Sequence, residues 1–128
     1  MYDIDLQSRI PIYEQLYRRI VELAVNGVLP EGTQLPSVRQ LAKDLSVNPN
    51  TVSKAYQNLE RDGVIYSLAG RGSFIGKIEK ADVHTDLLKE FDLAVQNVLR
   101  VGVSEDKLCD RIHKIAQDSK SGGKENDS

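Results

Sequence analysis

One stretch of this chain, from Leu35 to Ile75, constrains the fold more than any other. It contains, in order, a short amphipathic helical pattern, a tight turn, a second helical pattern with a polar face, and two β-rich runs around Ala-Gly-Arg-Gly. Ser37 and Asn48 precede the two helical patterns as N-caps, and Pro49 suits the first helical position. The order of helix, turn, helix and hairpin predicts a winged helix-turn-helix.

The turn between the two helical patterns has the spacing of this motif. Ala42 stands where the helices cross, Ser46 in the turn, and Val52 inside the second helix. Serine replaces the more usual glycine, so the turn either avoids a left-handed conformation or tolerates serine in it. Apolar residues at helical spacing predict the buried faces of both helices: Val38, Leu41, Ala42, Leu45, Val52, Ala55, Tyr56 and Leu59.

The two β-rich runs, Val64–Leu68 and Ser73–Ile78, predict a two-stranded wing. Gly70 and Gly72 lie between them and permit the positive φ angles that a tight hairpin needs. The wing would carry Arg71 at its tip.

The segments on either side complete a mainly α fold with a small β wing. Pro11 opens a helix that Gly27 ends, and residues 29–37 read as a Pro/Gly loop. After the wing, a short polar linker (78–82) leads to two helical patterns separated by Gly102. A short strand is expected from the alternation of Tyr2, Ile4 and Leu6.

Three parts are therefore expected along the chain. The last is rich in Gly, Ser and charge, a composition typical of disorder. The parts are a winged helix-turn-helix domain (1–78), a C-terminal helical pair (79–119) and a disordered tail (120–128).

The charge distribution favours a nucleic-acid partner more than the net charge of −2 does. Residues 33–77 contain six Lys/Arg and three Asp/Glu, hence +3, whereas residues 81–128 contain seven against ten, hence −3. The basic excess coincides with the motif. Because it is small, we expect modest non-specific DNA affinity and a dependence on specific contacts.

The sequence predicts a cytoplasmic protein without a membrane partner. No apolar run approaches the ~20 residues of a membrane span, and the first residues lack the apolar core of a signal peptide. The lone Cys109 excludes an internal disulfide. Its helical context favours a buried, inert thiol over a redox sensor.

A helix in the major groove must bury one face and present polar groups on the other. The second helix of the motif does this with short, uncharged side chains near its start, where a merely solvated face would carry a Glu/Lys mixture. Double-stranded DNA is therefore the expected partner. The candidate DNA-binding residues are Ser37, Arg39, Asn48, Asn50, Thr51, Ser53, Lys54, Tyr56, Gly70, Arg71 and Gly72.

Several of these candidates have a second interpretation. Arg39 could fork onto a guanine edge or a phosphate, or pair with Asp44 on the surface. Arg71 suits a minor groove, or is a solvated loop residue. Tyr56 could contact DNA, but its ring also fits the core.

The segments PIYEQLYRRI (11–20), LPSVRQLAKDLSVNPNTVSKAYQNLERDGVI (35–65) and GRGSFI (70–75) resemble the DNA-binding domain of the GntR family of bacterial transcriptional regulators, over about residues 8–78. The resemblance implies that Arg39 reads or anchors DNA, that residues 48–54 form the front of the recognition helix, and that the Gly70–Gly72 tip enters the minor groove. Family members often carry a basic residue where this chain has Pro49 or Ser53. Because of this departure, the resemblance does not imply which bases are read.

The C-terminal part resembles the YtrA-type branch of the family, in which a short tail forms a pair of dimerising helices. Too few residues follow the wing to enclose a ligand cavity in one chain. This resemblance implies repression of operons for ABC transporters, often ones linked to cell-envelope stress.

The apolar residues of the helical pair independently favour a homodimer. Two short helices cannot bury all of them, and a second copy is the favoured cover, although packing on the chain's own winged domain is an alternative. A twofold dimer would require a palindromic operator with half-sites ~34 Å apart. The residues are Leu87, Leu88, Phe91, Val95, Val98, Leu99, Leu108, Ile112 and Ile115.

Other classes of function have weaker support. His84 and His113 lie in separate helical patterns without a nucleophile or metal-ligand spacing, so no enzyme, metal or cofactor is expected. A winged helix that binds protein would show apolar or acidic residues on its polar helix face. An effector-gated regulator, with a small molecule at the dimer or domain interface, is neither required nor excluded by the sequence.

Overall fold

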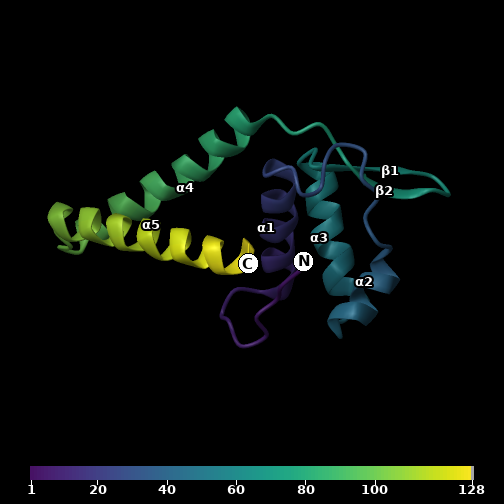
Figure 1. The fold of residues 1–128 in the computed structure, drawn as a ribbon, viewed down its shortest axis with the longest axis horizontal. Coiled ribbons are helices and arrows are strands. Elements are labelled where there is room, and N and C mark those ends of the chain that lie inside the picture. Colours follow the sequence, from purple (N-terminus) through teal and green to yellow (C-terminus); the bar gives the residue numbers. More distant parts are fainter. Residues whose placement is uncertain (128) are drawn as a thin grey trace. The chain divides into compact units, whose positions relative to one another are not determined.

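The computed structural model describes residues 1–127, without the side chains of 80, 81 and 121–127. It is mainly α with a small antiparallel sheet (Figure 1). The chain forms two compact units, Met1–Val83 and a second that begins at His84. The elements are α1 (Ile12–Val25), α2 (Val38–Leu45), α3 (Pro49–Arg61), β1 (Ile65–Leu68), β2 (Gly72–Ile75), α4 (Lys80–Arg100) and α5 (Glu105–Asp127).

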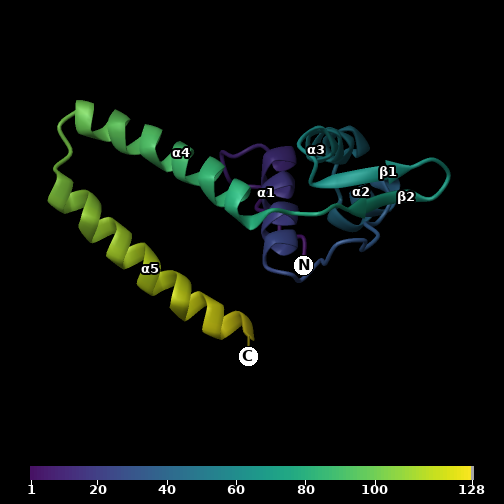
Figure 2. The same ribbon diagram turned by 90° about the horizontal axis from the view of Figure 1, so that it is seen from above.

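The helix α3 is the centre of the first unit, because it packs against α1, α2 and β1. Figure 2 shows α3 nearly end-on, between α1 and the hairpin. Full burial of a Leu or Ile side chain stabilises a fold by about 1.5–3 kcal/mol. The expected inner stripe of α3 is confirmed, and with α1 it supplies most of the core: Leu16, Ile20, Leu23, Ala24, Val52, Ala55, Tyr56 and Leu59.

The helix starts follow the expected caps. Ser37 Oγ accepts a bond from the Gln40 N–H (3.1 Å), and Asn48 Oδ1 accepts one from the Asn50 N–H (2.8 Å). Each cap satisfies a backbone donor that has no partner inside the helix. These bonds fix where α2 and α3 begin.

The turn between α2 and α3 is left-handed at Ser46 (φ 57°, ψ 44°). Of the two sequence interpretations, the second therefore holds: the turn needs this conformation and tolerates serine in it. The cost for a residue with a Cβ is about 1–2 kcal/mol. Bonds from the Ser46 N–H to the Lys43 carbonyl (3.2 Å) and from the Val47 N–H to the Ala42 carbonyl (3.0 Å) hold the turn closed.

The wing is a hairpin whose strands pair from Ile65↔Ile75 to Leu68↔Gly72. The second strand ends at Ile75, not at Ile78 as the β-rich run predicted. Its partner strand is preceded by Gly63 (φ +77°) and the end of α3, so little chain remains for pairing beyond Ile75.

The expected Pro/Gly loop contains a pairing that the sequence did not indicate. Its residues 32–35 run along the free edge of β2. The Leu35 N–H donates to the Ser73 carbonyl (2.9 Å), and the Ile75 N–H donates to the Thr33 carbonyl (2.9 Å). An antiparallel bridge joins Gln34 to Phe74 between these bonds. We call residues 32–35 the strap.

The short strand expected near the start is wrong, because residues 1–5 form no ladder and a turn begins at Leu6. Gln15 of α1 occupies the backbone polar groups instead. Its Oε1 accepts from the Asp5 N–H (2.8 Å), and its Nε2 donates to the Asp5 carbonyl (2.9 Å). Tyr2 and Ile4 still pack against the core, which explains the apolar alternation without a strand.

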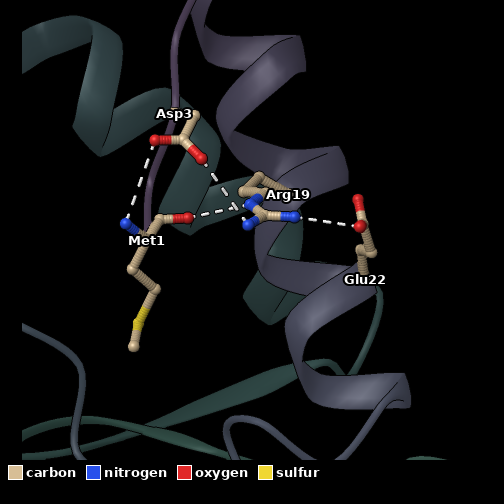
Figure 3. A network of polar contacts seen from close by, with 4 residues as sticks. All are labelled: Met1, Asp3, Arg19 and Glu22. Atoms are coloured by element: carbon tan, nitrogen blue, oxygen red, sulfur yellow. Dashed lines mark hydrogen bonds and ion pairs between the residues drawn. The ribbon is translucent and has the colours of Figure 1, made fainter. Parts of the chain in front are cut away.

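A polar network also holds this first segment on α1 (Figure 3). Arg19 donates to the Met1 carbonyl (2.8 Å) and to Glu22 (2.9 Å), and it lies 3.6 Å from the Asp3 carboxylate. Exposed pairs of this kind contribute roughly 0–1 kcal/mol each. The network therefore orients the segment more than it stabilises the unit.

In the C-terminal part, Gly102 (φ +91°) separates the two helices, and Ser104 Oγ accepts from the Lys107 N–H (3.2 Å) as the expected cap. Two expectations need correction. The helix α4 begins at Lys80, inside the expected linker (78–82), and α5 continues to Asp127, through most of the expected disordered tail (120–128). Glycine costs a helix about 1 kcal/mol per residue but does not forbid it. Residue 128 lies outside the described residues.

Candidate nucleic-acid interface

The outward face of α3 begins with short polar side chains, as the sequence predicted. Asn50 and Lys54 are exposed, and Thr51 and Ser53 are half-buried between the outer face and the core stripe. Small side chains at the start of a helix let the helix backbone approach base edges closely. The face therefore has the shape and chemistry for a major groove.

Asn48 contributes to this face mainly as a cap. Its Oδ1 already accepts the Asn50 N–H, which leaves its amide N–H groups for any outside partner. The same bond takes one of the first-turn N–H groups that could otherwise hold a phosphate.

The ammonium of Lys54 lies over the ring of Tyr13 on α1, with Nζ 4.0 Å from the ring centroid. A cation over an aromatic face gains roughly 0.5–1 kcal/mol at an exposed site. The contact holds the Lys54 charge beside α1 and the start of α3. Sequence reasoning missed Tyr13, because no local pattern links a residue of the first helix to one of the third.

Arg39 lies in the first turn of α2 and is exposed. The alternative pairing with Asp44 is not formed, since the Asp44 carboxylate accepts from Gln40 Nε2 (2.8 Å). The guanidinium makes no ion pair with any side chain that the structure describes. Its donors are thus available for a base edge or a phosphate.

The wing tip presents Arg71 between two glycines with positive φ, Gly70 (+75°) and Gly72 (+115°). The Arg71 N–H donates to the Leu68 carbonyl (2.9 Å), which closes the turn, and its side chain is exposed. The Arg71 carbonyl accepts from Gln34 Nε2 (2.9 Å). Sequence reasoning did not identify Gln34.

Tyr56 is a core residue, 6 % exposed, and its hydroxyl donates to the Pro36 carbonyl (2.7 Å). Burial raises the pKa of this hydroxyl, and the neighbouring Tyr2 raises it further. The ring therefore supports the segment that leads into α2, and little of it is left for a DNA contact.

The structure brings several candidates together in one groove, between the start of α2 and the wing tip. Its lining includes Ser37, Tyr56, Gly70, Arg71 and Gly72. Arg39 and the front of α3 belong to the same unit. The groove is formed by residues far apart in sequence, so only the structure could reveal it.

The two helices of the helical pair do not bury much of the expected dimerisation face between themselves. Leu88 and Ile115 are 60 % and 57 % exposed, and Val95, Val98 and Leu108 are half-buried. Phe91, Val98, Leu108 and Ile112 line an apolar groove between α4 and α5. The remaining members of the face, Leu87, Phe91, Leu99 and Ile112, are also exposed.

Cys109 is exposed, so the expected buried thiol is wrong. The helical pattern predicted correctly that Cys109 lies in a helix, α5. Spacing alone did not show which face of α5 packs against α4.

Among the described residues, no group of three or more His, Cys, Asp or Glu could hold a metal ion. Likewise, no helix in that part of the chain is both long and apolar enough to cross a membrane.

Comparison with known proteins identifies the family. Residues 12–75 match the family described as "Bacterial regulatory proteins, gntR family". The HTH-type transcriptional repressor YtrA of Bacillus subtilis (strain 168) is 41% identical over 131 residues, which cover 99% of this chain and 100% of that protein.

Two solved structures are also similar over most of their length. A transcriptional antiterminator from Listeria monocytogenes EGD-e has a TM-score of 0.72 and 37% identity, covering 94% of this chain and 90% of that one. YtrA from Sulfolobus acidocaldarius, a GntR-family transcription factor, has a TM-score of 0.59 and 36% identity, covering 73% of this chain and 97% of that one. With a winged helix-turn-helix and these relatives, the chain belongs to the GntR family, whose members are DNA-binding transcriptional regulators and not enzymes.

Proposed function

We propose that this chain is a cytoplasmic homodimeric repressor, which binds a palindromic operator and occludes the promoter of a transporter-type operon. The observation that carries the DNA part is the groove between α2 and the wing tip, with the exposed Arg39 and the polar front of α3 in the same unit. Repression rests on the similarity to YtrA of B. subtilis, which is named a repressor. The operon type rests only on the resemblance of the C-terminal part to the YtrA-type branch.

In this proposal the front of α3 reads the major groove through the candidate residues at 48–54. Arg39 forks onto a base or phosphate beside it, and Arg71 on the wing reaches the minor groove or its phosphates. Lys54, held by Tyr13, adds a positive charge next to the reading face. Tyr56 takes no direct part, because its hydroxyl is bonded to Pro36 inside the unit.

The dimer part rests on the uncovered apolar face of α4 and α5. Apolar side chains that stay more than half exposed, such as Leu88 and Ile115, are unfavourable in a lone chain. A second copy would cover them and place two recognition helices about one DNA turn, ~34 Å, apart. A twofold arrangement of this kind requires a palindromic operator.

Selection of bound duplexes from a random DNA pool at physiological salt tests the proposal. We expect a palindrome with half-sites about one turn apart. Enrichment of a single, non-repeated site would reject the twofold dimer but keep DNA reading.

No enrichment by folded protein would reject operator binding by the protein alone. Repeating the selection with added extract of small molecules then separates the two alternatives. Enrichment that needs the extract identifies an effector-gated regulator, whereas continued failure favours a module that binds protein.

A further inference from the structure

The side chain of Gln34, in the strap, forms a hydrogen bond that holds the wing tip. Gln34 Nε2 donates to the carbonyl of Arg71 (2.9 Å), although the two residues lie 37 positions apart in the chain. Arg71 is the candidate DNA contact at the tip, and the Gln34 amide bonds to the backbone carbonyl of that same residue. The orientation of that peptide group determines where the Arg71 side chain leaves the hairpin.

The backbone of the strap gives Gln34 a fixed position. The strap lies against β2, with Gln34 opposite Phe74 and backbone bonds on either side, at Thr33 and Leu35. Side chains on neighbouring strands that lie opposite one another share a face of the sheet. The Gln34 amide can therefore reach along the sheet to the hairpin turn.

Gly72 leaves room for the Gln34 amide, which would have to shift if a side chain were present there. A Cβ at Gly72 would lie 2.9 Å from Gln34 Nε2, closer than non-bonded atoms tolerate. The backbone at Gly72 also has a positive φ of +115°, which disfavours any residue with a side chain. The glycine thus serves both the turn and the contact with Gln34.

A two-stranded hairpin of this length is marginally stable by itself. Its turn would sample several orientations if the two strands alone determined it. The strap and the Gln34 amide restrict the turn, and the strap leads directly through Pro36 and Ser37 into α2, which carries Arg39. The wing tip and the start of α2 are thereby joined through one short segment.

We propose that Gln34 is a positioning residue, which orients the wing tip so that Arg71 can contact DNA. The inference rests on the proposed DNA-reading function and names a further residue for it. Gln34 acts through Arg71, and its amide need not touch the DNA.

The test is a double-mutant cycle on the selected duplex with the full chain. Gln34→Met keeps the side-chain length and removes the donor, and Arg71→Ala removes the proposed contact. We expect Gln34→Met to weaken specific binding about three- to tenfold, the range that loss of one hydrogen bond gives. In the Arg71→Ala background, the same change should weaken binding less than about twofold.

A second measurement reports the wing tip without DNA. Hydrogen exchange at the Gly72 and Arg71 amides should accelerate in Gln34→Met, while the thermal midpoint of the unit stays within about 2 °C of wild type. Gln7→Met, an exposed glutamine in the first turn of the same unit, is the matched control and should change neither quantity.

Equal losses from Gln34→Met in both backgrounds would overturn the inference, because Gln34 would then act independently of Arg71. Unchanged affinity and unchanged exchange would overturn it too. Failure of the proposed function looks different, because wild-type protein and every variant would then bind no duplex above the non-specific level.

Discussion

The winged unit and the helical pair differ in how they bury the apolar faces of their helices. In the first unit, α1 and α3 cover each other, and Leu16 and Leu59 are fully buried. In the helical pair, Leu88 and Ile115 stay more than half exposed. The first unit therefore has a complete core of its own, whereas the second has a face that needs a cover. The proposed function accordingly assigns DNA reading to the first unit and dimerisation to the second.

The largest expected effect is on the complete core. Leu59→Ala should reduce the free energy of unfolding by about 2–5 kcal/mol, because it leaves a cavity among α1, α3 and β1. Urea unfolding monitored by circular dichroism measures it. The matched truncation Leu88→Ala should cost less than about 0.5 kcal/mol at dilute protein and more at high concentration. If Leu59→Ala and Leu88→Ala reduced the free energy of unfolding equally at every protein concentration, the two regions would not differ in how completely they bury their apolar faces.

A charge on the uncovered face should break assembly. Ile115→Glu should weaken dimerisation by about 2–4 kcal/mol, because a carboxylate buried at an interface loses its hydration. Sedimentation equilibrium at micromolar protein measures the shift to monomer. Gln117→Glu, which makes the same charge change at an exposed position of α5, is the control. A wild type that is already monomeric would assign the cover of this face to something other than a second copy.

In the proposed function, specific DNA binding by the winged unit depends on Arg39. Arg39→Ala should cost roughly 1–3 kcal/mol of specific binding and relax selectivity at one base position, if the guanidinium forks onto a base. Binding to matched and mismatched duplexes measures both. Lys43→Ala removes an exposed cation from the same helix and should weaken all duplexes about equally. Native affinity in folded Arg39→Ala would exclude the residue from the interface.

Signals confined to a few neighbouring residues predicted most of the fold. The caps Ser37 and Asn48, the helix end at Gly63 and the turn glycines of the wing each act on their own backbone, so the sequence alone reveals them. The apolar stripe of α3 was predicted correctly for the same reason, since helical spacing is local. The polar front of α3 followed, because it is the opposite face of that stripe.

The features that sequence could not predict depend on partners far along the chain. The strap pairs with β2 across the whole helix-turn-helix, and Gly32 with the flanking Pro30 and Pro36 obscured any strand pattern. The first residues alternate like a strand, yet the side chain of Gln15 takes the place of a neighbouring strand. Tyr56 belongs to the predicted apolar stripe of α3, but its bond to Pro36 could not be inferred from spacing.

The smallest expected effect concerns pH and the end of α3. Asp62 follows the last residue of α3, where its carboxylate accepts from Arg61 and from the hydroxyl of Tyr17 on α1. These bonds, with the Arg61 bond the larger cause, hold the pKa of Asp62 below its usual value. A carboxyl with a lowered pKa in the folded protein stabilises it above the unfolded pKa of about 3.8. This stability is lost as the pH falls through the folded pKa.

Because the Asp62 side chain is 37 % exposed, solvent screens the interaction and the effect is modest. Asp62→Asn should therefore lower the free energy of unfolding at pH 7, with the difference from wild type shrinking as the pH falls below about 4. Urea unfolding between pH 7 and pH 2.5 measures this difference. Tyr17→Phe should reproduce a smaller part of the same pH dependence. A difference that is constant across the range would assign the role of Asp62 to its neutral hydrogen bonds and leave its charge without a part in holding α3 to α1.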